Sequence, residues 1–220
     1  MKSYFPILEL QFPALQPEET RILLMRPGPH KDNILTPKAV AMCRATGRAL
    51  ATTGVEINRV CSSPAARAIE TALETLHGYG KMVYFHTDVR LADTAINEAG
   101  QTAVKKVKAI MADRELSGEV EMAKILFDSD GEFSDLMTRR GDEGANYLRK
   151  INFEHPGKTI LVPSHGITRI ENTLMRLHGK GIHQPGKLVK TCQIINLVFN
   201  STRGEVIKEN WLELITTDLL

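Results

Sequence analysis

Short apolar runs alternate along the chain with longer amphipathic segments, which is typical of an α/β protein. Short apolar runs that end at turn residues predict β-strands. These runs cover Arg21–Met25, Ile57–Ser62, Lys81–Phe85, Lys158–Val162, Cys192–Phe199 and Glu205–Trp211, the last two around a turn at Asn200–Gly204. Strands separated by helices predict a three-layer sandwich, in which a mostly parallel sheet carries helices on both faces.

Two of the predicted helices have clear start signals. Thr36-Pro37 and Ser63-Pro64 each place a capping hydroxyl before a proline at the first helical position. The first predicted helix stops at Gly54, and the second stops at Gly78 and Gly80. The predicted helices cover residues 37–53, 64–77, 101–114, 143–151 and 167–177.

Residues 1–220 are predicted to form one domain with a cap, because the length suits a single core. The stretch from Leu116 to Gly141 is charged and interrupted by glycines, so we expect a variable cap with one or two short helices. Its acidic residues disfavour a polyanionic substrate. They are Glu119, Glu121, Asp128, Asp130 and Glu132.

Composition excludes several classes of protein. Lys and Arg total 28 against 26 Asp and Glu, which argues against a nucleic-acid binder. No apolar run reaches about 18 residues and the N-terminus lacks signal-peptide features, so we expect a cytoplasmic protein without a membrane partner. The widely spaced Cys43, Cys61 and Cys192 indicate buried thiols in a reducing compartment. No dinucleotide, phosphate-loop or metal-ligand motif occurs, so neither a cofactor nor a metal is expected.

Three cationic side chains follow the ends of predicted parallel strands. Arg26 ends the first strand, Arg67 follows the second on the first turn of its helix, and His165 follows the fourth. Ligands of such sheets bind beyond the carboxyl ends of the strands, where helix N-termini also favour anions. These residues therefore predict an anion site.

The motifs around these residues resemble the histidine phosphatase superfamily, with its phosphoglycerate-mutase-like fold. The resemblance covers about Arg21 to Leu177. Four pieces of sequence carry it, and the Ser-Ser-Pro piece and the Ser-His-Gly piece are specific only together. The pieces are Leu23-Leu24-Met25-Arg26-Pro27-Gly28 with Leu35-Thr36-Pro37; Cys61-Ser62-Ser63-Pro64-Ala65-Ala66-Arg67-Ala68-Ile69-Glu70-Thr71-Ala72; Leu91-Ala92-Asp93; and His155-Pro156-Gly157-Lys158 through Val162-Pro163-Ser164-His165-Gly166.

The resemblance implies a phosphohistidine mechanism, in which the histidine of an Arg-His-Gly loop accepts the phosphoryl group. Arg26, Arg67 and His165 are then the phosphate ligands. Asp93 is the implied acid that protonates the leaving oxygen, with Glu98 as a second candidate for that role.

One position departs from this pattern, because Pro27 stands where the family has its nucleophilic histidine. Proline has no side-chain nitrogen and cannot form a phosphoramidate. Pro27-Gly28 suits the centre of a type II turn, so the loop is expected to keep its shape without its chemistry. His30 lies three residues further along and is the candidate for a relocated nucleophile.

Three functions remain open from the sequence. The leading hypothesis is a catalytically impaired family member that binds phosphate, a phosphoester or a phosphorylated protein, since two arginines can hold phosphate without a nucleophile. The alternatives are an active phosphomonoesterase or phosphomutase that uses His30 or an activated water, and an interaction module with an empty pocket. On the simpler interpretation, His30, His86 and His183 are solvated loop residues. The oligomeric state is left open.

Overall fold

The computed structural model of the chain describes residues 12–128, 131–179 and 188–212. Its main sheet has six strands in the order β5-β4-β6-β1-β7-β8. Strands β5, β4, β6 and β1 run parallel to one another, whereas β7 is antiparallel to both β1 and β8. The strands are β1 (Glu19–Met25), β4 (Ile57–Ser62), β5 (Tyr84–Thr87), β6 (Thr159–Pro163), β7 (Ile194–Asn200) and β8 (Glu205–Leu212).

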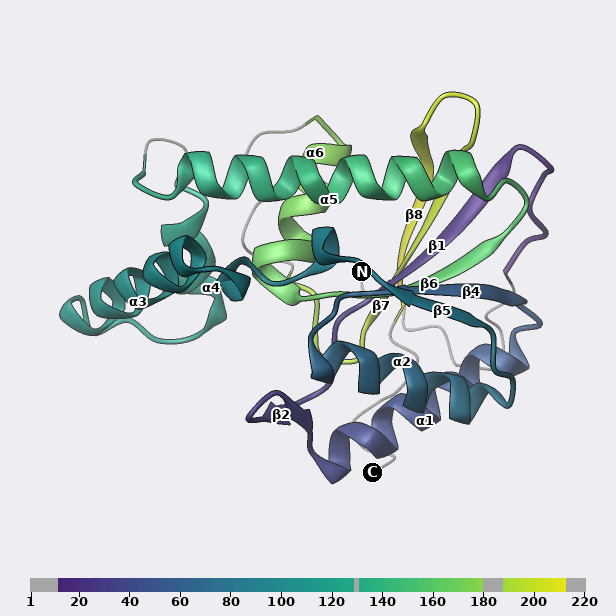
Figure 1. The fold of residues 1–220 in the computed structure, drawn as a ribbon, viewed down its shortest axis with the longest axis horizontal. Helices are drawn as coiled ribbons and strands as arrows, with labels where there is room; N and C mark the ends of the chain where they lie inside the picture. Colours follow the sequence, from purple (N-terminus) through teal and green to yellow (C-terminus); the bar gives the residue numbers. More distant parts are fainter. Residues whose placement is uncertain (1–11, 129–130, 180–187, 213–220) are drawn as a thin grey trace, which may run out of the picture.

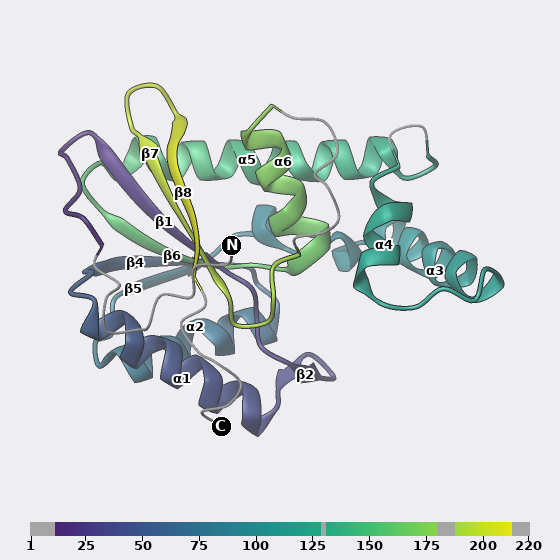
Figure 2. The same cartoon turned by 180° about the vertical axis from the view of Figure 1, so that it is seen from behind.

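Helices cover both faces of this sheet, which confirms the predicted three-layer α/β sandwich. Helices α1 (Pro37–Thr52) and α2 (Ala66–Tyr79) lie on one face, and α5 (Ser134–Glu154) and α6 (Asn172–Leu177) lie on the other (Figures 1 and 2). Helices α3 (Glu98–Asp113) and α4 (Glu119–Leu126) project to one side of the sheet, next to the start of α5. A small hairpin of β2 (His30–Lys31) and β3 (Ile34–Leu35) precedes α1.

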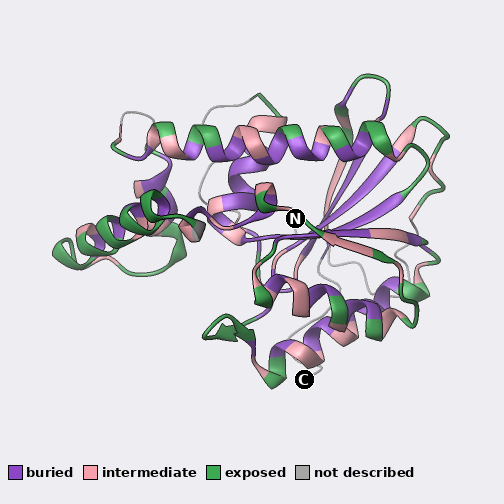
Figure 3. Cartoon of the chain, viewed as in Figure 1, coloured by how far each residue is buried: buried purple, intermediate pink, exposed green. Residues whose placement is uncertain are grey.

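The alternation of side chains along β1 builds two separate core layers. Leu23 and Met25 face the layer under α1 and α2, whereas Ile22 and Leu24 face the layer under α5 and α6. All four side chains are buried, as Figure 3 shows for most of the central strands. A third apolar cluster joins α3, α4 and the start of α5 to the main body through Ile167 and Met175.

Several element boundaries differ from the sequence prediction. The N-cap of α2 is Ala65 instead of Ser63, whose hydroxyl accepts from the Ala65 amide at 3.3 Å and lies 2.7 Å from His165 Nε2. The third strand starts at Tyr84 instead of Lys81, and α3 starts at Glu98 because Asn97 caps it.

Two glycines that the sequence indicates as breaks instead allow helices to pack closely. Gly78 lies inside α2, where a Cβ would come within 2.0 Å of the Arg44 carbonyl oxygen of α1, and Gly80 ends the helix at φ 80°. Gly141 likewise lies inside α5, where a Cβ would stand 2.5 Å from the Asn172 Oδ1 atom of α6. Helix α5 begins at Ser134, so the last part of the stretch predicted as a cap, Leu116 to Gly141, forms the first turns of this long helix, and Met137 there packs with α3 and α4.

Some predictions fall outside the described residues, namely those for Asp130 and His183.

The three cysteines are free and buried, as the sequence indicated. His86 is not a solvated loop residue, because it belongs to β5 and its Nε2 lies 2.9 Å from the Tyr147 hydroxyl. Within the described ranges, no helix is long and apolar enough to cross a membrane.

Candidate phosphate site

Three strand ends are joined at one edge of the sheet. The Ser164 amide donates to the Met25 carbonyl at 2.9 Å, and the Ser63 amide donates to the Pro163 carbonyl at 3.0 Å. The parallel strands β1, β6 and β4 therefore end side by side, and the residues that follow them enter one space.

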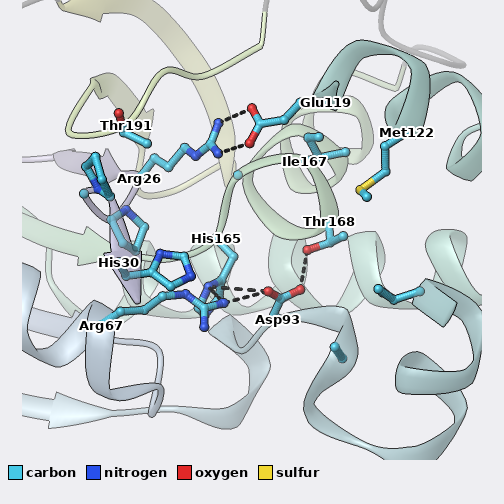
Figure 4. Close-up of a pocket in the computed structure, with 16 residues that line it drawn as sticks. Arg26, His30, Arg67, Asp93, Glu119, Met122, His165, Ile167, Thr168 and Thr191 are labelled. Carbon is cyan, nitrogen blue, oxygen red and sulfur yellow. Dashed lines mark hydrogen bonds and ion pairs between the residues drawn. The ribbon is translucent and has the colours of Figure 1, made fainter. Parts of the chain in front are cut away.

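A cleft of about 440 Å³ lies at this edge, within the usual size range of small-molecule sites. Figure 4 shows Arg26, His30, Arg67, Asp93 and His165 around it. The structure thus brings together these five sequence candidates, and Pro27 also lines the cleft. Glu98 is exposed at the start of α3 and is not among the described residues that line the cleft.

His165 is buried and held at both ring nitrogens. Arg67 Nη2 lies 2.8 Å from Nδ1, and the Ser63 hydroxyl lies 2.7 Å from Nε2. Since a guanidinium only donates, Nδ1 accepts, and Nε2 carries the proton that it donates to Ser63. Burial lowers the pKa of His165 to about 4, assisted by the neighbouring arginines, so the imidazole is neutral at pH 7.

Arg67 is fixed by polar partners on two other segments. Its Nη2 pairs with Asp93 Oδ2 at 2.8 Å, and its Nη1 donates to Asn33 Oδ1 at 2.7 Å. The Thr168 hydroxyl donates to the other Asp93 oxygen at 2.6 Å. Burial raises the pKa of Asp93, but the hydrogen bond from Thr168 and the charge of Arg67 favour the ionised form, and the net shift of the pKa is downward. Asp93 is therefore ionised and orients Arg67 in this arrangement.

Buried arginines hold the backbone that carries Asp93. Arg169 Nε donates to the Ala92 carbonyl at 2.9 Å, and Arg140 Nη2 donates to the carbonyls of Ala92 and Asp93 at 2.9 and 3.1 Å. Glu143 pairs with Arg140 at 2.6 Å. Because a buried guanidinium needs such partners, this network fixes the position of the Asp93 segment.

Arg26 is paired with a carboxylate of the cap. Its Nη1 donates to Glu119 Oε2 at 2.8 Å and to the Val189 carbonyl at 2.7 Å, and its Nη2 contacts the second Glu119 oxygen. The hydrogen bond from Arg26 lowers the pKa of Glu119, which is therefore ionised. Sequence reasoning missed this role of Glu119, because the sequence presents it only as part of an acidic stretch.

The other residues that the sequence did not single out are Asn33, Ser63 and Thr168. Ser63 belongs to a quoted motif in which the sequence predicts only a capping role, and Thr168 follows the Ser-His-Gly motif closely. Nothing in the sequence points to Asn33. It reaches Arg67 because Asp32 and Asn33 form the tight turn of the β2–β3 hairpin, both with positive φ. The described residues contain no group of three or more His, Cys, Asp or Glu that could hold a metal.

The loop after β1 differs from the type II turn that the sequence predicted. Such a turn needs a positive φ at Gly28, and Gly28 does not have one. Glycine is required there for space, since a Cβ would come within 2.6 Å of the Ala39 Cβ atom. Pro27 is buried beside it, and the hairpin then brings His30 to the rim of the cleft.

A family model matches most of the chain. The family model described as "Histidine phosphatase superfamily (branch 1)" matches residues 20–212. The chain belongs to the histidine phosphatase superfamily. The predicted family and the phosphoglycerate-mutase-like fold are thereby confirmed.

Solved structures of other proteins share the fold at low sequence identity. Phosphoglycerate mutase from Bacillus anthracis str. Sterne is 18% identical at a TM-score of 0.65, covering 89% of this chain and 93% of the other. Phosphoserine phosphatase from Entamoeba histolytica in complex with 3-phosphoglyceric acid is 17% identical at 0.64, covering 91% and 100%. A mutant of that phosphatase, in which alanine replaces a histidine, in complex with phosphoserine is 18% identical at 0.63, also covering 91% and 100%. No curated protein matches the chain.

Acid should destabilise the fold through His165. The unfolded chain takes up this proton near pH 6.5 and the folded chain only near 4, so the unfolded state binds more protons between these values. The free energy of unfolding should therefore fall as the pH drops through this window, by up to about 1.4 kcal/mol per pH unit from this group. Urea unfolding at a series of pH values measures it. His165→Asn should flatten the curve in this window, and parallel curves for the two proteins would contradict the assignment.

Proposed function

We propose that the chain is a phosphate- or phosphoester-binding member of the superfamily that lacks phosphohistidine catalysis. One observation carries the proposal. Pro27 is buried in the cleft between Arg26 and Gly28, at the position where the resemblance places the nucleophile. The groups that would hold a phosphate, Arg26, Arg67 and His165, surround the same space.

Phosphate binding can persist without the nucleophile because charged hydrogen bonds supply the affinity. Each is worth roughly 1.5–3 kcal/mol, and an arginine can donate two in parallel. Arg26 and Arg67 each already donate to a carboxylate, an anion whose oxygens accept hydrogen bonds from a guanidinium as phosphate oxygens do. A phosphoserine phosphatase of the same fold, in which alanine replaces a histidine, is found in complex with phosphoserine, which supports ligand binding after such a replacement.

The Ser63 hydroxyl, which contacts His165 beside the cleft, is poorly suited to replace the missing histidine. Ser63 is fully buried and accepts the Nε2 proton of His165, so His165 is not poised to deprotonate it. A nucleophile needs an adjacent base with a free lone pair. An ionised Asp93 also has no proton to give to a leaving oxygen.

A second candidate function is an active phosphomonoesterase or phosphomutase that uses His30 or an activated water. The observation that favours it is the position of His30, which lines the cleft from the β2–β3 hairpin and faces the region of Arg67 (Figure 4). A third candidate, an interaction module with an empty pocket, is favoured by the existing pairing of both arginines with carboxylates.

One pair of measurements separates these candidates. We expect inorganic phosphate or vanadate at millimolar concentration to raise the melting temperature, because a ligand of the native state stabilises it. We also expect no turnover of an aryl phosphate above that of a His30→Ala variant. Turnover by the natural chain that His30→Ala abolishes would establish the second candidate. No shift of the melting temperature with either anion would favour the third.

The proposed partner is phosphate, a phosphorylated small molecule or a phosphorylated protein. The near-balance of 28 basic and 26 acidic residues gives no support for a nucleic-acid partner, and a membrane partner is not part of the proposal. The three buried free thiols suit a reducing compartment, so a cytoplasmic location belongs to the same proposal.

A further inference from the structure

The charges that line the cleft balance one another before any ligand binds. Among the described residues, Arg26 and Arg67 supply two positive charges, and Asp93 and Glu119 supply two negative charges. Each arginine already pairs with one of the carboxylates. His165 adds no charge because both of its ring nitrogens are engaged and it is neutral. The four charged side chains therefore sum to zero, and they leave the two negative charges of a bound phosphate dianion unbalanced.

Glu119 is the carboxylate that a bound phosphate displaces. It takes two donors of the Arg26 guanidinium, the fork that would bind two phosphate oxygens. Asp93 is held by Arg67 and by Thr168, and its side chain is 30% exposed against 53% for Glu119. Glu119 is thus the carboxylate at the mouth of the cleft, whereas Asp93 belongs to its floor.

The helix that carries Glu119 keeps this carboxylate near the phosphate after displacement. Glu119 is the first residue of α4, and Ala123 and Leu126, one and two turns further along the same side of the helix, are buried in the cap cluster, the third apolar cluster, and fix α4 in place. The carboxylate can rotate, but the helix cannot retreat without opening that cluster. A displaced Glu119 would then face the phosphate as a like charge, which lowers affinity unless a cation lies between them.

The wall beside Glu119 suits a short carbon chain. Met122 lies one turn further along α4 on the same face, and Ile167 and Val104 also line the cleft (Figure 4 labels Met122 and Ile167). Apolar walls with a few fixed polar groups are the usual composition of small-molecule sites.

We propose that this site takes a small phosphomonoester that carries an ammonium group. Its phosphate binds Arg26 and Arg67, its short carbon chain lies against Met122 and Ile167, and its ammonium pairs with the carboxylate of Glu119. This inference rests on the proposed phosphate-binding function and names the class of ligand for the same site. The ammonium replaces Arg26 as the partner of Glu119, so both carboxylates and both arginines stay paired.

Calorimetric titration with two matched ligands tests the proposal. O-phosphoethanolamine and ethyl phosphate share the phosphate and a two-carbon chain, and only the first carries an ammonium. At low salt and pH 7.5, we expect the natural chain to bind O-phosphoethanolamine about tenfold more tightly, which equals about 1.4 kcal/mol. In Glu119→Gln the two affinities should agree within about twofold. Ethyl phosphate should bind this variant at least as tightly as the natural chain, because the competitor for Arg26 has lost its charge.

Glu121→Gln is the control variant. Glu121 lies on the same helix, pairs with Lys124 at 2.7 Å and is not among the described residues that line the cleft, so its loss should leave the tenfold preference unchanged. Equal affinities of the natural chain for the two ligands, or a preference that persists in Glu119→Gln, would overturn this inference alone. Absence of binding of both ligands and of inorganic phosphate to the natural chain and to Glu119→Gln would overturn the proposed function as well.

Discussion

Replacing Pro27 with histidine is expected to create an aryl phosphatase from a chain that has little or no turnover. The new imidazole would follow Arg26 at the end of β1, in the wall of the cleft that Arg67 and His165 also line. It would supply the nucleophile that the proline lacks. Loss of a nucleophile costs enzymes up to about 10⁶-fold in kcat, so even an imperfect restoration should give at least about a hundredfold gain.

Steady-state hydrolysis of an aryl phosphate measures this gain, and an acid-labile, base-stable phosphoenzyme would identify the covalent intermediate. Pro27→Ala is the matched control, because it also removes the ring but adds no nitrogen, and it should stay inactive. A Pro27→His chain that binds phosphate as tightly as the natural chain yet shows no turnover would mean that residue 27 does not face the bound phosphate.

Removing the charge of Arg67 is expected to abolish most phosphate binding. Arg67 is positioned by Asp93 and Asn33 to present its guanidinium at the cleft, and its side chain is only 17% exposed. Arg67→Met would remove up to two charged hydrogen bonds to phosphate and leave the Asp93 carboxylate unpaired beside the anion. At roughly 1.5–3 kcal/mol for each bond, the Kd for phosphate should rise by about a hundredfold or more.

Calorimetry or ligand-induced shifts of the melting temperature would measure this loss. Arg48→Met is the control, since Arg48 is exposed on α1 and does not line the cleft among the described residues. Because Arg67→Met also leaves the Asp93 carboxylate without its arginine, the double variant Arg67→Met with Asp93→Asn should fold more stably than Arg67→Met and still bind phosphate weakly. Phosphate affinity that survives both variants would place the anion elsewhere on the molecule.

The fold and most of the site residues could be predicted from local sequence patterns. The apolar run of β1 is bounded by turn residues, and its partners β4 and β6 carry the same signature, so the position of Arg26 and His165 at strand ends followed from the chain itself. The sequence predicts Thr36 as the cap of α1, and Thr36 does accept from the Ala39 amide at 3.2 Å. Such features depend on residues within a few positions of one another, which a sequence displays directly.

Helix ends and glycine roles could not be predicted in this way. Gly78 and Gly141 carry the signal of a stop, yet each lies inside a helix because a neighbouring helix passes too close for a side chain. Gly28 suits a turn with positive φ, yet it is needed for its contact with Ala39. A glycine looks the same in the sequence whether it provides backbone freedom or close approach.

The sequence by itself determined the family, the α/β sandwich and the presence of proline at position 27, because these depend on residue identity and local spacing. Only the tertiary structure decided which groups hold the arginines. Glu119 reaches Arg26 across 93 positions of the chain, and Asp93 reaches Arg67 across 26. Charge pairing depends on distance in space and on desolvation, which no local sequence pattern shows. Because of this pairing, the two arginines of the predicted anion site are already neutralised by two carboxylates.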